Sequence, residues 1–325
     1  MREKRRKKRI RHLLILLFLT SLYLSTAAYS WFSTNRTVYI SELSIKVQAQ
    51  GGIEISTNAV NWSTRINQED IINAKATYAN SVNQLPMTME PVSTGKIVSN
   101  GKLQMYHGYT ESVGNDYILL AQKDEEKEGK EGKFMAFDVF LKADNETRLY
   151  LSNASGAFYQ GLTSGIENSV RFAFLNEGTS GDKTNSIMAQ NLNHATADTT
   201  YIWEPNYDSH SANGIKNASQ VYGLNINNLD GKQIVYDGLI SNISKSNNVL
   251  VGDANVAKYP NLFKRVNVDL LTKKEFSENI EMFTLNPGIT KIRIYIWIEG
   301  QDVDCENKSA IGDIEFKFQF TSNPA

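Results

Sequence analysis

The chain has 325 residues, enough for one large domain or two ordinary ones. Its composition, with 41% hydrophobic and 21% charged residues, excludes a disordered chain and predicts a packed core. The net charge of −1 is unevenly distributed: residues 1–12 hold eight basic side chains and one acid, which leaves 26 basic and 34 acidic residues, a charge of −8, for the rest. Such an acidic body lacks the clustered Lys and Arg that phosphate contacts require, so nucleic acid is not an expected partner.

The N-terminal segment predicts export from the cell. After the basic residues 1–12, residues 13–32 contain no charged side chain. Twenty residues in a helix span about 30 Å, the thickness of the hydrocarbon core of a bilayer. Because the positive charges remain on the cytoplasmic side, everything after this segment is expected to face outward. The predicted location is therefore extracellular or at the cell surface, with the membrane as a partner through residues 13–32.

Two interpretations of the apolar segment remain open. A cleaved signal peptide has small residues before the cut, and the sequence STAAYS places the cut after Ala28 or Ser30. An uncleaved transmembrane helix needs about 20 apolar residues, which residues 13–32 supply if the aromatic residues at their end form an interfacial belt. The first interpretation adds a signal peptidase as a partner, and the second anchors the chain by one transmembrane helix.

Several stretches alternate apolar and polar residues with the period of a β-strand. In chain order they are residues 37–56, 134–142, 147–152, 169–176, 292–298 and 314–320. The pair Gly51-Gly52 inside the first stretch predicts a tight turn, and the sequence ADNE between the second and third predicts a β-hairpin. Residues 65–82 predict a helix, since their apolar residues fall near one face.

The expected fold class is all-β. Consecutive strands without intervening helices favour an antiparallel β-sandwich of jelly-roll or immunoglobulin-like type with helical insertions, preceded by one N-terminal hydrophobic helix. Residues 33–325 form the extracytoplasmic part, with insertions at about 57–133 and 176–290. Whether this part is one domain or two stays open.

Common catalytic motifs are missing from the sequence. The four histidines, His12, His107, His194 and His210, do not form the H-E-x-x-H pattern of a zinc protease, and neither a G-x-S-x-G elbow nor a phosphate-binding loop occurs. The single cysteine, Cys305, rules out an internal disulfide. The chain is therefore expected not to be an enzyme.

Two stretches remain as candidate sites. Asp302, Asp304 and Glu306 alternate, so in an extended loop they can point the same way and bind calcium, or they can form an acidic turn whose side chains bond local amides. The loop 201–210 combines an aromatic residue with polar ones and suits either a sugar-binding loop or a core tryptophan beside a turn. Its candidate residues are Trp203, Glu204, Asn206, Asp208 and His210.

Both ends of the chain carry a family resemblance. The sequence TAAYSWFSTNRTV, followed by SIKVQAQGGIEISTNAVNWS, resembles the start of exported proteins of Gram-positive, spore-forming bacteria, and IYIWIEGQDVDCEN resembles a C-terminal motif of uncharacterised members. More distantly, the chain is similar to the biofilm-fibre and camelysin family, whose jelly-roll domains follow a signal cleaved by a dedicated peptidase. The resemblance implies this fold class, a surface location and self-assembly. It carries over no catalytic residue, because no matching metal motif is present.

The expected function is that of an exported, non-enzymatic structural protein of a bacterial cell surface or biofilm matrix, whose exposed strands contact copies of itself or other envelope polymers. One alternative is a surface module that binds or hydrolyses glycans through the 201–210 loop or the 302–306 acids. Another is a membrane-anchored component of a secretion or spore-coat apparatus. No cofactor is expected apart from the calcium considered at residues 302–306.

Overall fold

The computed structural model describes residues 38–48, 52–114, 116–160, 165–222, 231–305 and 313–324. The basic segment 1–12, the apolar segment 13–32 and both candidate cleavage positions lie outside these residues. Within the described part of the chain, no helix combines the length and the apolar character needed to cross a bilayer. The predictions of a leader or an anchor therefore remain predictions.

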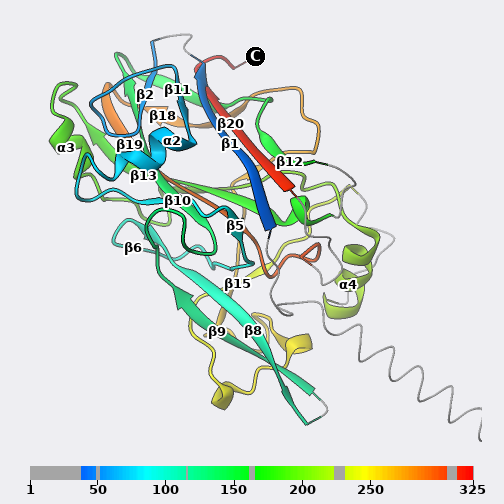
Figure 1. Cartoon of the computed structure of the whole chain (residues 1–325). Helices are drawn as coiled ribbons and strands as arrows, with labels where there is room; N and C mark the ends of the chain where they lie inside the picture. Colours follow the sequence, from blue (N-terminus) through cyan, green and yellow to red (C-terminus); the bar gives the residue numbers. More distant parts are fainter. Residues whose placement is uncertain are drawn as a thin grey trace, which may run out of the picture.

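Strands far outnumber helices in the described chain, and two seven-stranded sheets hold the longest strands (Figure 1). The first sheet has the order β18-β11-β20-β1-β3, with β12 on β20 and β5 on β1. Its strands are β1 (Val38–Gln48), β3 (Arg65–Asn67), β5 (Thr88–Met89), β11 (Thr147–Leu151), β12 (Gly156–Gln160), β18 (Ile280–Leu285) and β20 (Asp313–Thr321).

The second sheet has the order β17-β14-β13-β19-β10-β2, with β4 on β10. Strand β19, which carries the cleanest alternation in the sequence, lies in the middle of this sheet between β13 and β10. The strands are β2 (Glu54–Ser56), β4 (Asn83–Gln84), β10 (Met135–Ala143), β13 (Val170–Ser180), β14 (Thr200–Glu204), β17 (Leu270–Leu271) and β19 (Gly288–Ile298).

The two sheets face each other across one hydrophobic core. Phe316, Phe318 and Phe320 of β20 are buried, whereas the alternate residues Lys317 and Gln319 are only partly buried, as the period of a strand requires. These rings meet side chains of the second sheet: Phe318 lies 6.1 Å from Phe172 and 6.3 Å from Phe137, measured between ring centroids. Offset and edge-to-face aromatic pairs of this kind add to the stabilisation from buried apolar area.

The strands predicted from alternation exist, but the hairpin predicted through the ADNE turn is wrong. Strand β10 belongs to the second sheet and β11 to the first, so the ADNE turn crosses between sheets instead of closing a hairpin. Strands β1 and β2 also belong to different sheets. Strands β10 and β11 both contribute to the core between the sheets rather than pairing edge to edge.

The sequence suggested purely antiparallel sheets, but two pairs of strands are parallel. Strand β1 pairs with β20 in parallel, and the first and last described strands of the chain thus lie side by side (Figure 1). Strand β14 likewise pairs with β17 in parallel. Parallel neighbours need a long connection, which the many residues between these strands supply.

The outer face of the second sheet is covered as well. Tyr295 and Trp297 of β19 point away from the first sheet and are fully buried in a second apolar cluster with Val92, Met105 and Tyr236. This layer contains the small sheets β6 (Val98–Ser99) with β7 (Lys102–Leu103) and β15 (Asp237–Leu239) with β16 (Phe263–Arg265).

The described helices are short. Helix α2 (Gln68–Ala74) is capped by Asn67, whose side chain accepts a hydrogen bond from the Asp70 amide, but residues 65–67 form β3, so the helix predicted over 65–82 is too long. The β-strand pairing of 65–67 with β1 outweighs the helical pattern there. The others are α3 (Ser186–Gln190), α4 (Ala212–Tyr222) and the 3-10 turns η1 (Ile166–Ser169), η3 (Lys245–Asn247) and η4 (Val251–Asp253).

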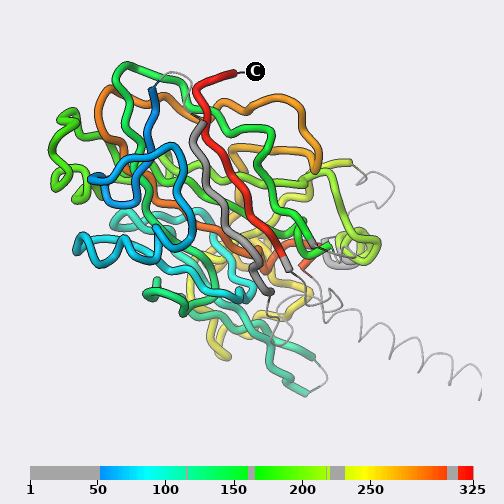
Figure 2. The backbone as a smooth tube through the Cα atoms, turned by 45° about the horizontal axis from the view of Figure 1, so that its top comes forward, coloured from blue at the N-terminus to red at the C-terminus, as the bar shows by residue number. Residues whose placement is uncertain are grey.

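One hairpin projects from the body. Strands β8 (Met105–Val113) and β9 (Asp116–Asp124) form a two-stranded ribbon that extends from the end opposite the C-terminus in both views (Figures 1 and 2). Strand β9 is bridged to the body at two places, Ala121 to Ile243 and Ile118 to Leu250. The ribbon therefore has one edge supported by the body.

Candidate functional site

The two stretches singled out from the sequence meet at one end of the second sheet. Strand β14 ends at Glu204, and the turn that follows β19 carries Asp302 and Asp304. Arg171 of the neighbouring strand β13 lies between them and has no exposed surface. The 201–210 loop and the acids Asp302 and Asp304, separated by about a hundred residues in sequence, thus form one cluster.

Arg171 is the centre of this cluster. Its Nη2 lies 2.6 Å from Oε1 of Glu204 and 2.5 Å from Oδ2 of Asp302, and its Nη1 donates to the carbonyl oxygens of Asn168 and Val170 at 2.9 Å. The other oxygen of Glu204 accepts a hydrogen bond from Gln233 Nε2 at 2.6 Å. A guanidinium suits this position because its fixed fork can bond several oxygens at once.

Burial and ion pairing together set the pKa values of Arg171 and Glu204. Burial by itself lowers the pKa of Arg171, but the charges of Glu204 and Asp302 outweigh it and raise the pKa. Burial also raises the pKa of Glu204, against the lowering effect of Arg171. A buried ion pair is stable only while both partners are present, since either one alone would be an unpaired charge in a low-dielectric interior.

A second pair closes the cluster toward α4. His210 Nδ1 lies 2.8 Å from Asp304 Oδ2, and His210 Nε2 lies 2.8 Å from the Lys232 carbonyl oxygen. The other oxygen of Asp304 accepts from the Ser211 amide at 2.7 Å, next to the start of the helix. Burial alone would lower the pKa of His210, but the hydrogen bonds with Asp304 and Lys232 and the nearby carboxylates raise it to about 9. Both ring nitrogens are therefore engaged, and the imidazolium form is favoured.

This pair predicts a pH dependence of stability. The pKa of His210 rises from 6.5 to about 9 in the folded chain, so its contribution is complete below 6.5 and is lost as the pH rises through 9. We expect the midpoint of urea unfolding to fall between these pH values. A His210→Gln variant, which cannot be charged, should show a smaller fall over the same range. An equal fall in both proteins would remove His210 as the cause.

Sequence reasoning missed two members of this region. Arg171 appears in the sequence as the polar residue of an alternating strand. The strand is covered on both faces, and a buried charge on such a strand needs a partner. The charge between apolar neighbours was therefore the signal that could have revealed the ion pair. Glu299 follows β19, is fully buried, and accepts hydrogen bonds from Trp297 Nε1 and the Gln301 amide, each at 3.0 Å. Burial raises its pKa to about 7.

The sugar-binding interpretation of the 201–210 loop is wrong for Trp203. This side chain has no exposed surface, lies 4.6 Å from Phe172 between ring centroids, and donates through Nε1 to Thr272 at 3.0 Å. Asn206 is buried and donates to the Ala157 carbonyl, and Asp208 accepts from the Lys274 amide. Trp203 is thus a core residue beside a turn, as the alternative interpretation had it.

The calcium site at 302–306 remains a prediction. Asp302 bonds Arg171 and the Asp304 amide, while Asp304 bonds His210 and the Ser211 amide. Glu306 lies outside the described residues. In the part of the chain that the structure describes, no three His, Cys, Asp or Glu side chains are arranged to hold a metal ion.

The charged side chains of this cluster bond one another. Its cations are held by its carboxylates, and these contacts tie the ends of β14 and β19 to the start of α4. Cys305 follows directly and is 5% exposed. The arrangement fixes three loops at one end of the sheet.

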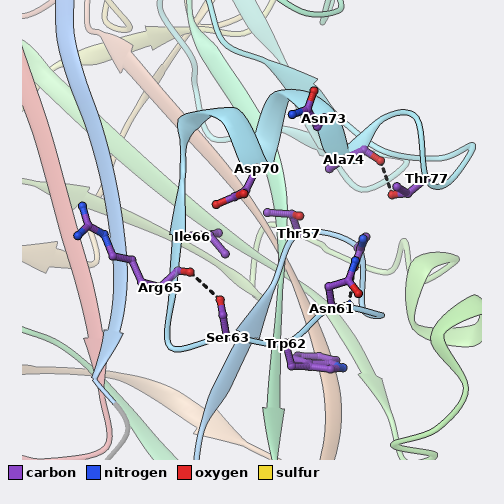
Figure 3. A pocket seen from close by; sticks show the side chains of 11 residues that line it. Thr57, Asn61, Trp62, Ser63, Arg65, Ile66, Asp70, Asn73, Ala74 and Thr77 are labelled. Atoms are coloured by element: carbon purple, nitrogen blue, oxygen red, sulfur yellow. Dashed lines mark hydrogen bonds between the residues drawn. The ribbon is translucent and has the colours of Figure 1, made fainter.

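A surface groove of about 400 Å³ lies between the 57–66 segment and α2 (Figure 3). Figure 3 shows Ser63 between Arg65 and Trp62, and Asp70 on the side of α2. Its polar groups serve the local backbone: Asp70 accepts from the Asn67 amide at 2.8 Å, and Ser63 donates to the Arg65 carbonyl at 2.6 Å. One face of the Trp62 ring is covered by Lys142, 4.5 Å from the centroid.

Comparison of the chain with protein-family models, with curated proteins and with solved structures yields no match.

Proposed function

We propose that the chain is an exported structural protein of a bacterial cell surface or extracellular matrix, without enzymatic activity and able to assemble with copies of itself. Export is supported by the basic and apolar segments that precede residue 33. A structural role is supported by the cluster around Arg171, where the groups that could do chemistry are held in buried pairs. Within this proposal the two sheets form a sandwich of jelly-roll or immunoglobulin-like type.

The observation that carries self-assembly is the free edge of β8. Strand β9 covers one edge, and Ser93 bridges the other edge at Tyr106. Beyond Tyr106, no strand of the described chain pairs with that second edge. Tyr109 and Val113 are 39% and 48% exposed on the same ribbon. A long exposed edge with apolar side chains is a template for pairing with another chain.

The register shows which amides face this edge. The Leu119 amide donates to Val249 and the Ala121 amide to Ile243, so both point away from β8. Their cross-strand partners are Thr110 and Gly108. In an antiparallel ladder the two residues of such a pair point their amides in opposite directions, so the Thr110 amide points to the open edge.

A proline at this position therefore tests the proposal. Thr110→Pro removes one outward N–H and no bond to β9, so we expect fibres to be lost at concentrations where the wild type polymerises, with little change in melting temperature. The matched variant Thr110→Ala keeps the amide and should polymerise as the wild type does. Fibres in both variants, or a wild type that stays monomeric at every concentration, would contradict assembly through β8.

Export is tested separately by mass spectrometry of the N-terminus in cell fractions. A released chain that begins after Ala28 or Ser30 supports a matrix subunit processed by a signal peptidase. An intact N-terminus in the membrane fraction supports the anchored alternative. A folded, intact chain in the cytosol would contradict the proposal.

A further inference from the structure

Four charged side chains are buried together in the middle of the second sheet, away from the Arg171 cluster. Asp138 belongs to β10, Lys291 and Arg293 to β19, and Glu177 to β13, and each is at most 2% exposed. Strand β19 lies between the other two strands, and the register places Arg293 opposite Asp138. Charges in an interior are costly unless they are paired, so the arrangement of this group needs a reason.

Lys291 reaches the carboxylate of Asp138. Its Nζ lies 3.3 Å from Asp138 Oδ2 and donates to the Gln190 carbonyl oxygen at 3.0 Å. The ring centroid of Tyr78 lies 5.8 Å from the same Nζ. Burial lowers the pKa of Lys291 despite Asp138, which raises it, and the charge of Arg293 lowers it further. Desolvation and a neighbouring cation are two ways in which proteins activate a lysine amine as a nucleophile.

The carboxylate of Asp138 is surrounded by donors. Arg293 donates from Nε to Oδ1 at 2.7 Å and from Nη2 to Oδ2 at 3.2 Å. The Tyr78 hydroxyl and the Val82 amide also donate to Oδ2, each at 3.2 Å. Burial raises the pKa of Asp138, but the charges of Arg293 and Lys291 outweigh it and lower the pKa. An amine attacks such an ionised carboxylate only where the charge that builds up on its oxygens is stabilised, which fixed donors of this kind do.

Glu177 is placed to carry protons between the two groups. It lies at a break in the register of β13, next to Gly178, which pairs with Lys291. Its Oε2 accepts from the Ala195 amide at 3.0 Å. Its Oε1 lies 3.6 Å from Arg293 Nη1 and accepts no hydrogen bond from the described residues. A buried oxygen of this kind calls for an explanation, and a role in proton transfer supplies one.

The surroundings favour condensation of the amine with the carboxylate. Both side chains are 1% exposed, and exclusion of water opposes the reverse reaction, hydrolysis of an amide. An amide also replaces two buried charges by a neutral group, which removes the cost of their desolvation. Arg293 and Glu177 remain as a pair of opposite charge, so the group is balanced before and after the reaction.

We propose that Lys291 and Asp138 condense to an amide bond that cross-links β19 to β10. The Lys291 nitrogen attacks Cγ of Asp138, the new C–N bond forms, and one carboxylate oxygen leaves as water with two protons from the ammonium group. Glu177 takes up one of these protons and passes it to the leaving oxygen, so it ends in the state in which it began. The reaction consumes no other reagent. This inference goes beyond the structural role proposed above and does not depend on it.

The test is the mass of the full chain, kept folded and then denatured for mass spectrometry. We expect the wild type to be lighter than its sequence by the mass of one water molecule. Trypsin does not cut after an acylated lysine, so peptides 134–142 and 275–293 should appear as one cross-linked species. Lys183 is the control within the chain: its Nζ lies 2.6 Å from Asp144, but this pair is exposed and should stay uncross-linked.

Three variants identify the reacting groups, and the result for the wild type does not depend on whether they fold. Lys291→Met removes the nucleophile and should lose no water. Asp138→Asn keeps a carbonyl group that the amine can attack, but should lose ammonia instead of water. Glu177→Gln should form the bond at least about tenfold more slowly, with a circular dichroism spectrum like that of the wild type.

Three results would overturn the proposal. The first is a folded wild type with the full mass of its sequence. The second is a loss of water that persists in Lys291→Met, and the third is a Glu177→Gln variant that forms the bond as fast as the wild type does.

Discussion

Replacing Arg171 by methionine is expected to lower the free energy of unfolding by about 3–5 kcal/mol, because Glu204 and Asp302 would remain as unpaired carboxylates in the interior. The guanidinium has no exposed surface, and its two partners are almost as deeply buried. Such a loss is a large part of the stability of an ordinary domain. Urea denaturation followed by circular dichroism measures it directly.

Two matched variants show whether the loss is electrostatic. Adding Glu204→Gln and Asp302→Asn to the methionine variant removes the orphaned charges and should recover part of the stability. Arg148→Met removes an arginine that is 67% exposed and pairs with Glu281 at 3.4 Å, and should lower the free energy of unfolding far less than Arg171→Met does. If Arg148→Met and Arg171→Met cost the same, the cluster does not hold the loops as described.

Replacing Trp297 by alanine is expected to cost about 3–5 kcal/mol, the usual range for a fully buried tryptophan. Trp297 points to the outer face of the second sheet, where Met105 and Tyr236 cover it. On a sheet with one solvent-exposed face, the same position would tolerate alanine with little loss. The variant therefore tests whether the outer layer is part of the folded core.

The control for this variant lies on the first sheet. Phe158 of β12 is 39% exposed, with Lys317 5.4 Å from the ring centroid. We expect Phe158→Ala to cost about 1 kcal/mol or less. Thermal unfolding of both variants, read by the same probe, gives the comparison. A Trp297→Ala protein as stable as Phe158→Ala would show that the outer layer separates from the sheet.

Strand positions could be predicted from the sequence because alternation depends only on neighbouring residues. The run from Ile292 to Ile298 and the phenylalanines of β20 follow this rule, and both became central strands. Strand partners could not be predicted in the same way. Alternation states which face of a strand is apolar, but two successive strands satisfy it equally well as a hairpin or as members of opposite sheets.

The sequence predicted two parts of the candidate site separately, without their meeting. Alternating acids at Asp302 and Asp304, and the polar loop that ends at His210, were each found from residue type and spacing. Their meeting depends on Arg171 and on the pairing of β13 with both β14 and β19, which is set by tertiary structure. Trp203 was ambiguous because a tryptophan beside a polar turn has the same sequence pattern in a core as in a binding loop.

The central claim is that copies of this chain assemble through the free edge of β8. Hydrogen exchange of the soluble protein and of the assembled protein, read at the β8 peptide by mass spectrometry, tests it most directly. We predict that Thr110 and Ser112 exchange fast in the soluble protein and become protected in the assembly, while β19 is protected in both. Assemblies in which the β8 amides exchange as fast as in the soluble protein would contradict the claim.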